Sequence, residues 1–336
     1  MDRRTAVTVA LATILVVGLI LIADPGEVAD AIQGADYTIL LAVVLLYVIN
    51  LLFKSGRWYM LLAAADHKVS LKDCLTYFSV GQAFNNLIPG RVVGEATRVY
   101  NLYEVNDVPV GTSLATIVTE RVMDLVLLTV IAVSGLVLLA PLLVDEIMNE
   151  LISGVIVAVV VNGIIIYFLA RPDVVERIGQ RAANWIGRKV SARWGQKLST
   201  WLEKMCHSFR DAMRLSKGSQ RWHMFGAISF TVLIWVNEVG RLFLIMVALG
   251  TDVSIFAVMI ATSLSTLSSV FLPAGSGNVV MTTAIFQSVG IPLSEATTAG
   301  VLSALTSIWL SIPIGVIAML LTGLRVHKES EIKEGA

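Results

Sequence analysis

The chain has 336 residues, of which 56% are hydrophobic and 15% are charged, and its mean hydropathy is +0.78. This composition excludes an ordinary water-soluble domain, because too few polar residues are available to cover its surface. It indicates an all-α polytopic membrane protein. The formal net charge is zero, so we expect no nucleic-acid partner.

Cysteine and histidine residues are few and scattered. The two cysteines lie far apart in the chain, so a disulfide framework is not indicated. The histidines lack the spacing of metal ligands, and we expect no metal ion and no cofactor. These residues are Cys74, Cys206, His67, His207, His223 and His327.

Six apolar segments are long enough to cross a bilayer. A spanning helix needs about 20 apolar residues, because the hydrocarbon layer is about 30 Å thick. The first segment is predicted to be a retained helix rather than a cleaved signal peptide, because its apolar run is long and Leu21 occupies a position where a small residue would precede a cut. The segments are residues 6–23, 37–53, 113–142, 151–170, 222–249 and 293–322.

The charges between these segments predict the orientation. Residues 171–221 hold twelve Lys or Arg against four Asp or Glu, whereas residues 24–36 hold acidic residues and no Lys or Arg. Positive loops stay in the cytoplasm, so both termini are expected inside, in a prokaryotic plasma membrane. Lys54 and Arg57, directly after the second segment, are also expected on the cytoplasmic side.

Two further apolar segments, residues 74–104 and 255–288, are interrupted. The first contains a polar stretch from Asn85 to Gly90, and the second contains SSVFLPAGSGN. Non-helical backbone at membrane depth is tolerated only beside protein or water that satisfies its N–H and C=O groups. The pattern predicts two re-entrant hairpins around a polar cavity. The alternative is that both breaks simply end ordinary helices.

The two interrupted segments resemble a degenerate inverted repeat. Pro89 and Pro273 are each followed by a glycine turn, a second apolar half and another proline, Pro109 or Pro292. Paired broken helices of this kind mark the substrate site in many transporters. The predicted organisation is one membrane domain, residues 1–336, with a hairpin plus helix at 74–144 and 255–322 and a basic segment at 171–221.

Acidic residues and arginines recur together in the apolar segments. A charge in the bilayer core costs at least ~2.5 kcal/mol, so these side chains are expected to face the protein interior and to pair. Such pairs can also merely hold helices together. The sets are Arg91, Glu95 and Arg98; Glu120, Arg121 and Asp124; and Glu238 with Arg241.

Arginine beside a broken helix suits an anionic group, because its guanidinium matches phosphate or carboxylate oxygens. We hypothesise that Arg91 and Arg98 hold a lipid phosphate and that Glu95 positions Arg98. Glu120 and Asp124, with Arg121 between them, would form a network that switches the cavity between the two faces.

The basic segment at 171–221 also shows an apolar stripe at helical spacing, which includes Trp194 and Trp201. A basic amphipathic helix of this kind lies in the headgroup layer and attracts anionic lipids. The alternative is that its charges only enforce the orientation.

The stretch NNLIPGRVVGEATRVY, followed by VTERVMD and later by LPAGSGNVV, resembles the flippase-like family that includes the transmembrane region of lysylphosphatidylglycerol synthases. The resemblance covers about residues 5–325 and implies a role in moving or handling charged lipids. The matching positions are Pro89, Arg91, Gly94, Glu95, Arg98, Glu120, Arg121, Asp124, Pro273, Gly275 and Gly277.

Two departures from the family pattern stand out. Val93 replaces the first glycine of a pair before Glu95, and no acidic residue follows the glycines of the second motif. Recognition of the substrate is therefore expected to depend mainly on the first hairpin. We also expect the chain to lack the soluble aminoacyl-transferring domain of the synthases.

The predicted function is a lipid transporter or flippase-like protein for anionic phospholipids or polyprenyl-phosphate-linked lipids. One alternative is a membrane-embedded transferase that uses Glu120 and Asp124 as a carboxylate pair. Another is a scaffold for a separate lipid-modifying enzyme. The expected partners are anionic headgroups, the membrane, and such an enzyme or a second copy of the chain.

Overall fold

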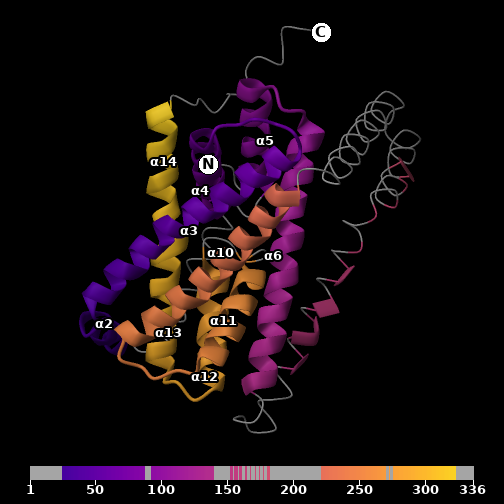
Figure 1. Cartoon of the computed structure of the whole chain (residues 1–336). Helices are drawn as coiled ribbons and strands as arrows, with labels where there is room; N and C mark the ends of the chain where they lie inside the picture. The colour runs from indigo at the N-terminus through magenta and orange to yellow at the C-terminus, as the bar shows by residue number, and fades with distance from the viewer. Residues whose placement is uncertain are drawn as a thin grey trace.

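The computed structural model describes residues 25–87, 92–139, 221–269 and 275–322, with Leu272 and scattered residues between 152 and 181 (Figure 1). These residues form helices and no strand. The elements are α2 (Pro25–Gln33), α3 (Tyr37–Ala64), α4 (Leu71–Leu87), α5 (Val92–Asn106), α6 (Val110–Leu139), α10 (Arg221–Ala248), α11 (Ile255–Ser268), α12 (Ser276–Ser288), α13 (Leu293–Ala304), η2 (Leu305–Trp309) and α14 (Leu310–Thr322).

Four helices among the described residues are long and apolar enough to cross a membrane. They are α3, α6, α10 and the continuous run Leu293–Leu320 through α13, η2 and α14. They match four of the six predicted spans, and the chain is an all-α integral membrane protein. The predicted span 6–23, most of the span 151–170, and nearly all of the basic segment 171–221 lie outside the described residues.

Helix α3 is longer than the sequence predicted. Asp36 caps its N-terminus, where one carboxylate oxygen accepts from Thr38 N at 2.8 Å. The helix then continues eleven residues beyond position 53, where the span was expected to end. Arg57, which was expected in the flank after this span, belongs to the helix itself, and its side chain lies inside the bundle with 3% of the residue exposed. The sequence did not indicate this extension of the helix, because Lys54 and Arg57 resemble the basic residues that commonly follow the end of a span.

Both interrupted segments form pairs of helices. Helix α4 ends at Leu87 and α5 begins at Val92, while α11 ends at Ser268 and α12 begins at Ser276. The helix breaks were therefore correctly predicted. In Figure 1 the pair α4 and α5 lies toward one end of the bundle and the pair α11 and α12 toward the other. Re-entry into the bilayer and the inverted repeat stay predictions, and Pro89, Arg91 and Pro273 lie outside the described residues.

Helix α4 lies very close to two neighbours because three glycines leave room for it. A Cβ added at Gly81 would lie 2.8 Å from Gly94 O on α5, and one added at Gly94 would collide with Gly81 O and the Asn85 side chain. On its other side, a Cβ added at Gly315 of α14 would lie 2.7 Å from Ser79 O. Backbone therefore meets backbone at both contacts, so larger side chains would push the helices apart.

The largest apolar core lies among α6, α10, α11, α12 and α13. Its fully buried side chains include Ile245, Met246, Ile260 and Phe286. Helix α3 packs along α10 and also contacts α4, α6 and η2, so it connects α10 to the pair α4 and α5. The polar side chains described below lie where these helices converge.

The last spanning helix contains a π-helical turn, η2, followed by Pro313 in α14. Proline lacks an N–H and its ring crowds the carbonyl four residues earlier, so the regular hydrogen-bond ladder cannot continue through it. The wider π-turn lies directly before this interruption, as is common at functional sites. In this π-turn, the carbonyls of Thr306 and Ile308 accept hydrogen bonds from side chains of other helices.

Candidate functional site

A polar cavity of about 180 Å³ lies where α3 to α6 meet α10 to α12 and η2. Seven of the side chains that line it are charged, although the surrounding helices are strongly apolar. The charged lining residues are Lys54, Arg57, Arg98, Glu120, Arg121, Asp124 and Glu238.

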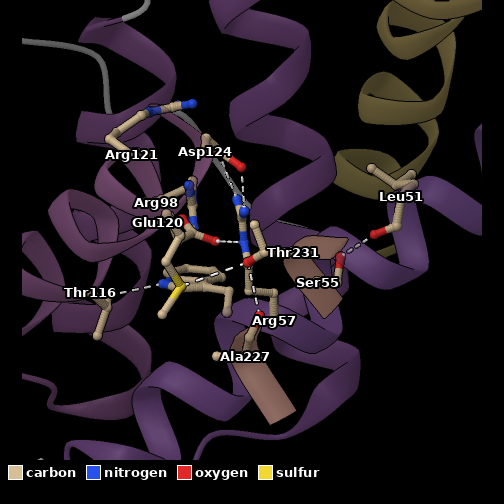
Figure 2. Close-up of polar contacts among 12 residues, drawn as sticks. Leu51, Ser55, Arg57, Arg98, Thr116, Glu120, Arg121, Asp124, Ala227 and Thr231 are labelled. Atoms are coloured by element: carbon tan, nitrogen blue, oxygen red, sulfur yellow. Dashed lines mark hydrogen bonds and ion pairs between the residues drawn. The ribbon is translucent and has the colours of Figure 1, made fainter. Parts of the chain in front are cut away.

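Arg57 of α3 lies at the centre of this group (Figure 2). Its Nη1 and Nη2 donate to the two carboxylate oxygens of Asp124 at 2.5 and 3.1 Å, and its Nε lies 3.5 Å from Glu120 Oε1. Trp235 of α10 donates through Nε1 to Asp124 Oδ1 at 3.0 Å. The three helices α3, α6 and α10 are thereby joined through one carboxylate.

Arg98 of α5 bridges two carboxylates. Its Nη1 donates to Glu95 Oε2 at 2.9 Å and its Nη2 to Glu120 Oε2 at 2.7 Å. Its guanidinium carbon also lies 4.0 Å from the ring centroid of Trp58 and 4.7 Å from that of Phe78. The side chain is 2% exposed and both terminal nitrogens are engaged, so Arg98 holds the site together in this conformation.

Arg121 is the most open of the guanidinium groups. Its Nη2 donates to Glu95 Oε1, and 40% of its side chain is exposed. The sequence suggested a neighbour in Asp124, but Arg121 pairs with Glu95 of α5 instead. Asn85 supports this contact, because its Nδ2 donates to Glu95 Oε1 at 3.4 Å while its Oδ1 accepts from Gly94 N at 3.0 Å.

A second charged group lies on α3 and α10. Lys54 Nζ donates to Glu238 Oε1 at 2.8 Å, and Arg241 Nη1 donates to Glu238 Oε2 at 3.1 Å. Arg241 Nη2 also donates to the Thr306 carbonyl of the π-turn at 3.2 Å. Its guanidinium lies 5.1 Å from the ring centroid of Tyr47. This group therefore connects the charged cavity to the irregular part of the last helix.

The charges of these two groups do not balance. The described ion pairs contain five cations, from one lysine and four arginines, but four carboxylates. One positive charge is in excess in a poorly solvated space, where an unpaired charge is costly. Such a site attracts an anion. Among the described residues no three His, Cys, Asp or Glu side chains are grouped as metal ligands.

The structure brings together most of the predicted site residues that it describes. The local pairs Glu95 with Arg98 and Glu238 with Arg241 form as their spacing of three indicated. Gly275 and Gly277 lie at the start of α12 instead, where Gly275 has a φ of 85° and Gly277 approaches the Ser268 backbone. Sequence reasoning missed Lys54, Arg57 and Trp235, and the helical spacing of Lys54 and Arg57 was the available signal.

Several known proteins resemble this chain along most of its length. A UPF0104 membrane protein of Methanothermobacter thermautotrophicus is 30% identical over 341 residues, with 98% of each chain covered. A UPF0104 membrane protein of Methanocaldococcus jannaschii is 26% identical, with 87% of this chain and 86% of the relative covered.

A longer relative is named glycosyltransferase AglD and comes from Haloferax volcanii. It is 25% identical, and the match covers 99% of this chain but 57% of that protein. No solved structure matches the chain. The family model described as the lysylphosphatidylglycerol synthase transmembrane region matches residues 7–315. The chain therefore belongs to the lysylphosphatidylglycerol synthase transmembrane-region family.

Proposed function

We propose that the protein carries lipids with a negatively charged headgroup between the two leaflets of the plasma membrane, with both of its termini in the cytoplasm. The observation that carries this proposal is the charged cavity inside a bundle of apolar helices, lined by four cations and three carboxylates within ion pairs that contain five cations and four carboxylates. A phosphodiester headgroup supplies the one negative charge that balances the site.

The basic side chains of the cavity have different roles in this proposal. Arg57 and Arg98 are buried and already engaged with carboxylates, so they shape the cavity. Arg121 and Lys54 are 40% and 20% exposed at their side chains and each has one carboxylate partner, so they are the cations that meet the phosphate. This assignment replaces the earlier hypothesis that Arg98 itself holds the phosphate.

Movement of the headgroup requires the ion pairs to exchange partners. Glu95 lies between Arg98 and Arg121, and Glu238 lies between Lys54 and Arg241. A phosphate that takes Arg121 or Lys54 leaves each carboxylate its other cation, so no buried charge is stranded. The site can therefore accept and release an anion at low cost.

A second candidate function is a membrane partner for a lipid-modifying enzyme. It is favoured by the match to glycosyltransferase AglD, in which a region similar to this whole chain makes up 57% of a longer protein. In that case the cavity would present a charged lipid to a separate enzyme rather than release it in the other leaflet.

Lipid translocation into purified proteoliposomes tests the proposal. Labelled phosphatidylglycerol should cross faster than labelled phosphatidylcholine, and faster than in protein-free liposomes. The Arg121→Gln variant should slow phosphatidylglycerol about tenfold or more, because it loses a charge-assisted hydrogen bond. Lys72→Gln is the matched control, because Lys72 is an exposed residue at the start of α4, away from the cavity.

Folded protein that moves no lipid would overturn the transport proposal. Equal rates for both lipids, unchanged by Arg121→Gln, would show that the charged cavity is not the route. Binding of phosphatidylglycerol without movement would favour the partner function instead.

A further inference from the structure

The cavity wall has an uncharged polar part that the proposed function does not use. Its side chains are amides and hydroxyls, and they come from α4, α11, α12 and η2, whereas the charged ones come from α3, α5, α6 and α10. The uncharged lining residues used below are Gln82, Asn86, Thr266, Asn278 and Ser307.

Asn86 has used both of its amide donors within the protein, and Asn278 has used one of its two. Asn86 Nδ2 donates to Ser311 Oγ at 2.7 Å and to the Ile308 carbonyl at 3.4 Å. Asn278 Nδ2 donates to Ser303 Oγ at 3.1 Å. Neither amide oxygen accepts a hydrogen bond from the described residues, so both remain as acceptors.

The hydroxyls show the same pattern. Thr266 Oγ1 donates to the Thr262 carbonyl at 2.8 Å, and Ser307 Oγ donates to the Ser303 carbonyl. A hydroxyl whose hydrogen is used in this way offers only its lone pairs. Gln82 makes no hydrogen bond with the described residues and is half-buried, so its amide can both donate and accept.

The charged and uncharged parts are continuous along α4. Phe78, Gln82 and Asn86 follow one another at spacings of four, so they share one face of the helix, and all three line the cavity. Phe78 contacts Arg98 at one end and Asn86 contacts the π-turn at the other. Eight residues of helix separate these ends, a distance of about 12 Å. A ligand with two different parts fits this arrangement.

We infer that the acceptor-rich wall binds the hydroxyl groups of a polyol that is joined to the phosphate, so that the substrate class is a polyol phosphate lipid. This inference rests on the proposed function. Hydroxyl donors match lone-pair acceptors, whereas phosphate oxygens would be repelled by them. Glycerol, inositol and sugar headgroups have the required chemistry.

An ammonium headgroup fits the site less well, although it too is a donor. The carboxylates that line the cavity come from α6 and α10, so an ammonium at the uncharged wall would be buried without a counter-charge. A zwitterionic lipid would also leave the excess positive charge of the cavity unbalanced. A polyol phosphate balances that charge and places no second charge at the wall.

Binding of short-chain lipids to the purified full-length protein in detergent tests the inference separately from transport. The probes are dioctanoyl phosphatidylinositol, dioctanoyl phosphatidylethanol and dioctanoyl phosphatidylethanolamine, with inositol phosphate as a soluble probe. The first two share a single negative charge and differ in their hydroxyl groups. Phosphatidylinositol should bind more tightly than phosphatidylethanol by about fivefold for each hydrogen bond formed.

The Gln82→Met variant should reduce that preference by about fivefold and leave the Kd of phosphatidylethanol unchanged. Because Gln82 makes no hydrogen bond with the described residues, this variant keeps the fold, and Asn278→Leu serves as a second variant at the same wall. Equal Kd values for phosphatidylinositol and phosphatidylethanol would overturn the inference, and so would tighter binding of phosphatidylethanolamine.

The outcomes separate the inference from the proposed function. A preference for phosphatidylinositol in binding, without translocation in proteoliposomes, would support the polyol site and overturn transport. If inositol phosphate binds as tightly as phosphatidylinositol, the polyol site is supported and its substrate is a soluble molecule rather than a lipid. Translocation of anionic lipids with no preference among headgroups would keep transport and overturn the polyol site.

Discussion

Arg57 on α3 and Asp124 on α6 form a bidentate ion pair inside the bundle, with Nη1 to Oδ1 at 2.5 Å and Nη2 to Oδ2 at 3.1 Å. The residues are 67 positions apart in the sequence. A paired guanidinium and carboxylate of this geometry compensate each other, and each loses its main partner when the other is removed; Arg57 would then keep only its longer contact with Glu120, at 3.5 Å.

Replacement of Asp124 by leucine should therefore destabilise the protein by about 3 kcal/mol, the lower end of the cost of breaking a buried pair, because Arg57 keeps Glu120 as its remaining carboxylate. The double variant Arg57→Met with Asp124→Leu should recover much of this loss, since Glu120 keeps Arg98 as its partner. Thermal unfolding of the purified variants in one detergent measures both effects. Equal melting temperatures for the single and double variants would contradict this account.

Arg98→Lys should lower the stability of the protein by more than a conservative exchange normally does. An ammonium on one flexible stem cannot reach Glu95 and Glu120 together while stacking on Trp58, so about 1.5–3 kcal/mol should be lost. Thermal unfolding measures the loss. Arg121→Lys is the comparison, because Arg121 pairs with Glu95 alone and is partly exposed, and its loss of stability should be smaller.

Gly94→Ala should separate α4 from α5. The added methyl group would collide with Gly81 O and with the Asn85 side chain that supports Glu95. We expect a lower yield of folded protein and a lower melting temperature. Gly240→Ala on α10 is the control, because a Cβ at Gly240 has no neighbour within 4 Å, and it should stabilise the helix by about 0.5–1 kcal/mol. Similar outcomes for the two variants would rule out the close contact as the cause.

Pro313→Ala should allow α13 and α14 to continue as one regular helix, because it restores an N–H and removes the ring. The Trp309 carbonyl, four residues before position 313, would then gain a backbone donor, and loss of the π-turn would move the Thr306 and Ile308 carbonyls away from Arg241 and Asn86. We expect unchanged or higher thermal stability together with slower lipid movement. Transport at the rate of the unaltered protein would show that the π-turn is not needed for movement of the headgroup.

The sequence allowed some parts of this site to be predicted because they are local. Glu95 with Arg98 and Glu238 with Arg241 are three residues apart on one helix, and helical geometry alone brings them together. The positions of the breaks in α4–α5 and α11–α12 were likewise marked by Pro and Gly.

The partners that join different helices could not be predicted in the same way. Arg57 meets Asp124 because α3 crosses α6, and no local pattern encodes that crossing. The wide turn at η2 also escaped prediction, because LTSIW has no breaker of its own and Pro313 lies beyond it. Both features depend on packing between elements rather than on periodicity within one.

The glycine contact between α4 and α14 limits how the molecule can change shape. Because Gly315 brings α14 against the Ser79 backbone, the two helices have almost no side-chain layer between them that could slide or repack. We expect them to move as one rigid body. They also carry Asn86 and Ser311, and the contact between Gly81 and Gly94 ties α5 to α4 in the same way. This side of the cavity is therefore expected to stay fixed while the charged residues on α6 and α10 move relative to it.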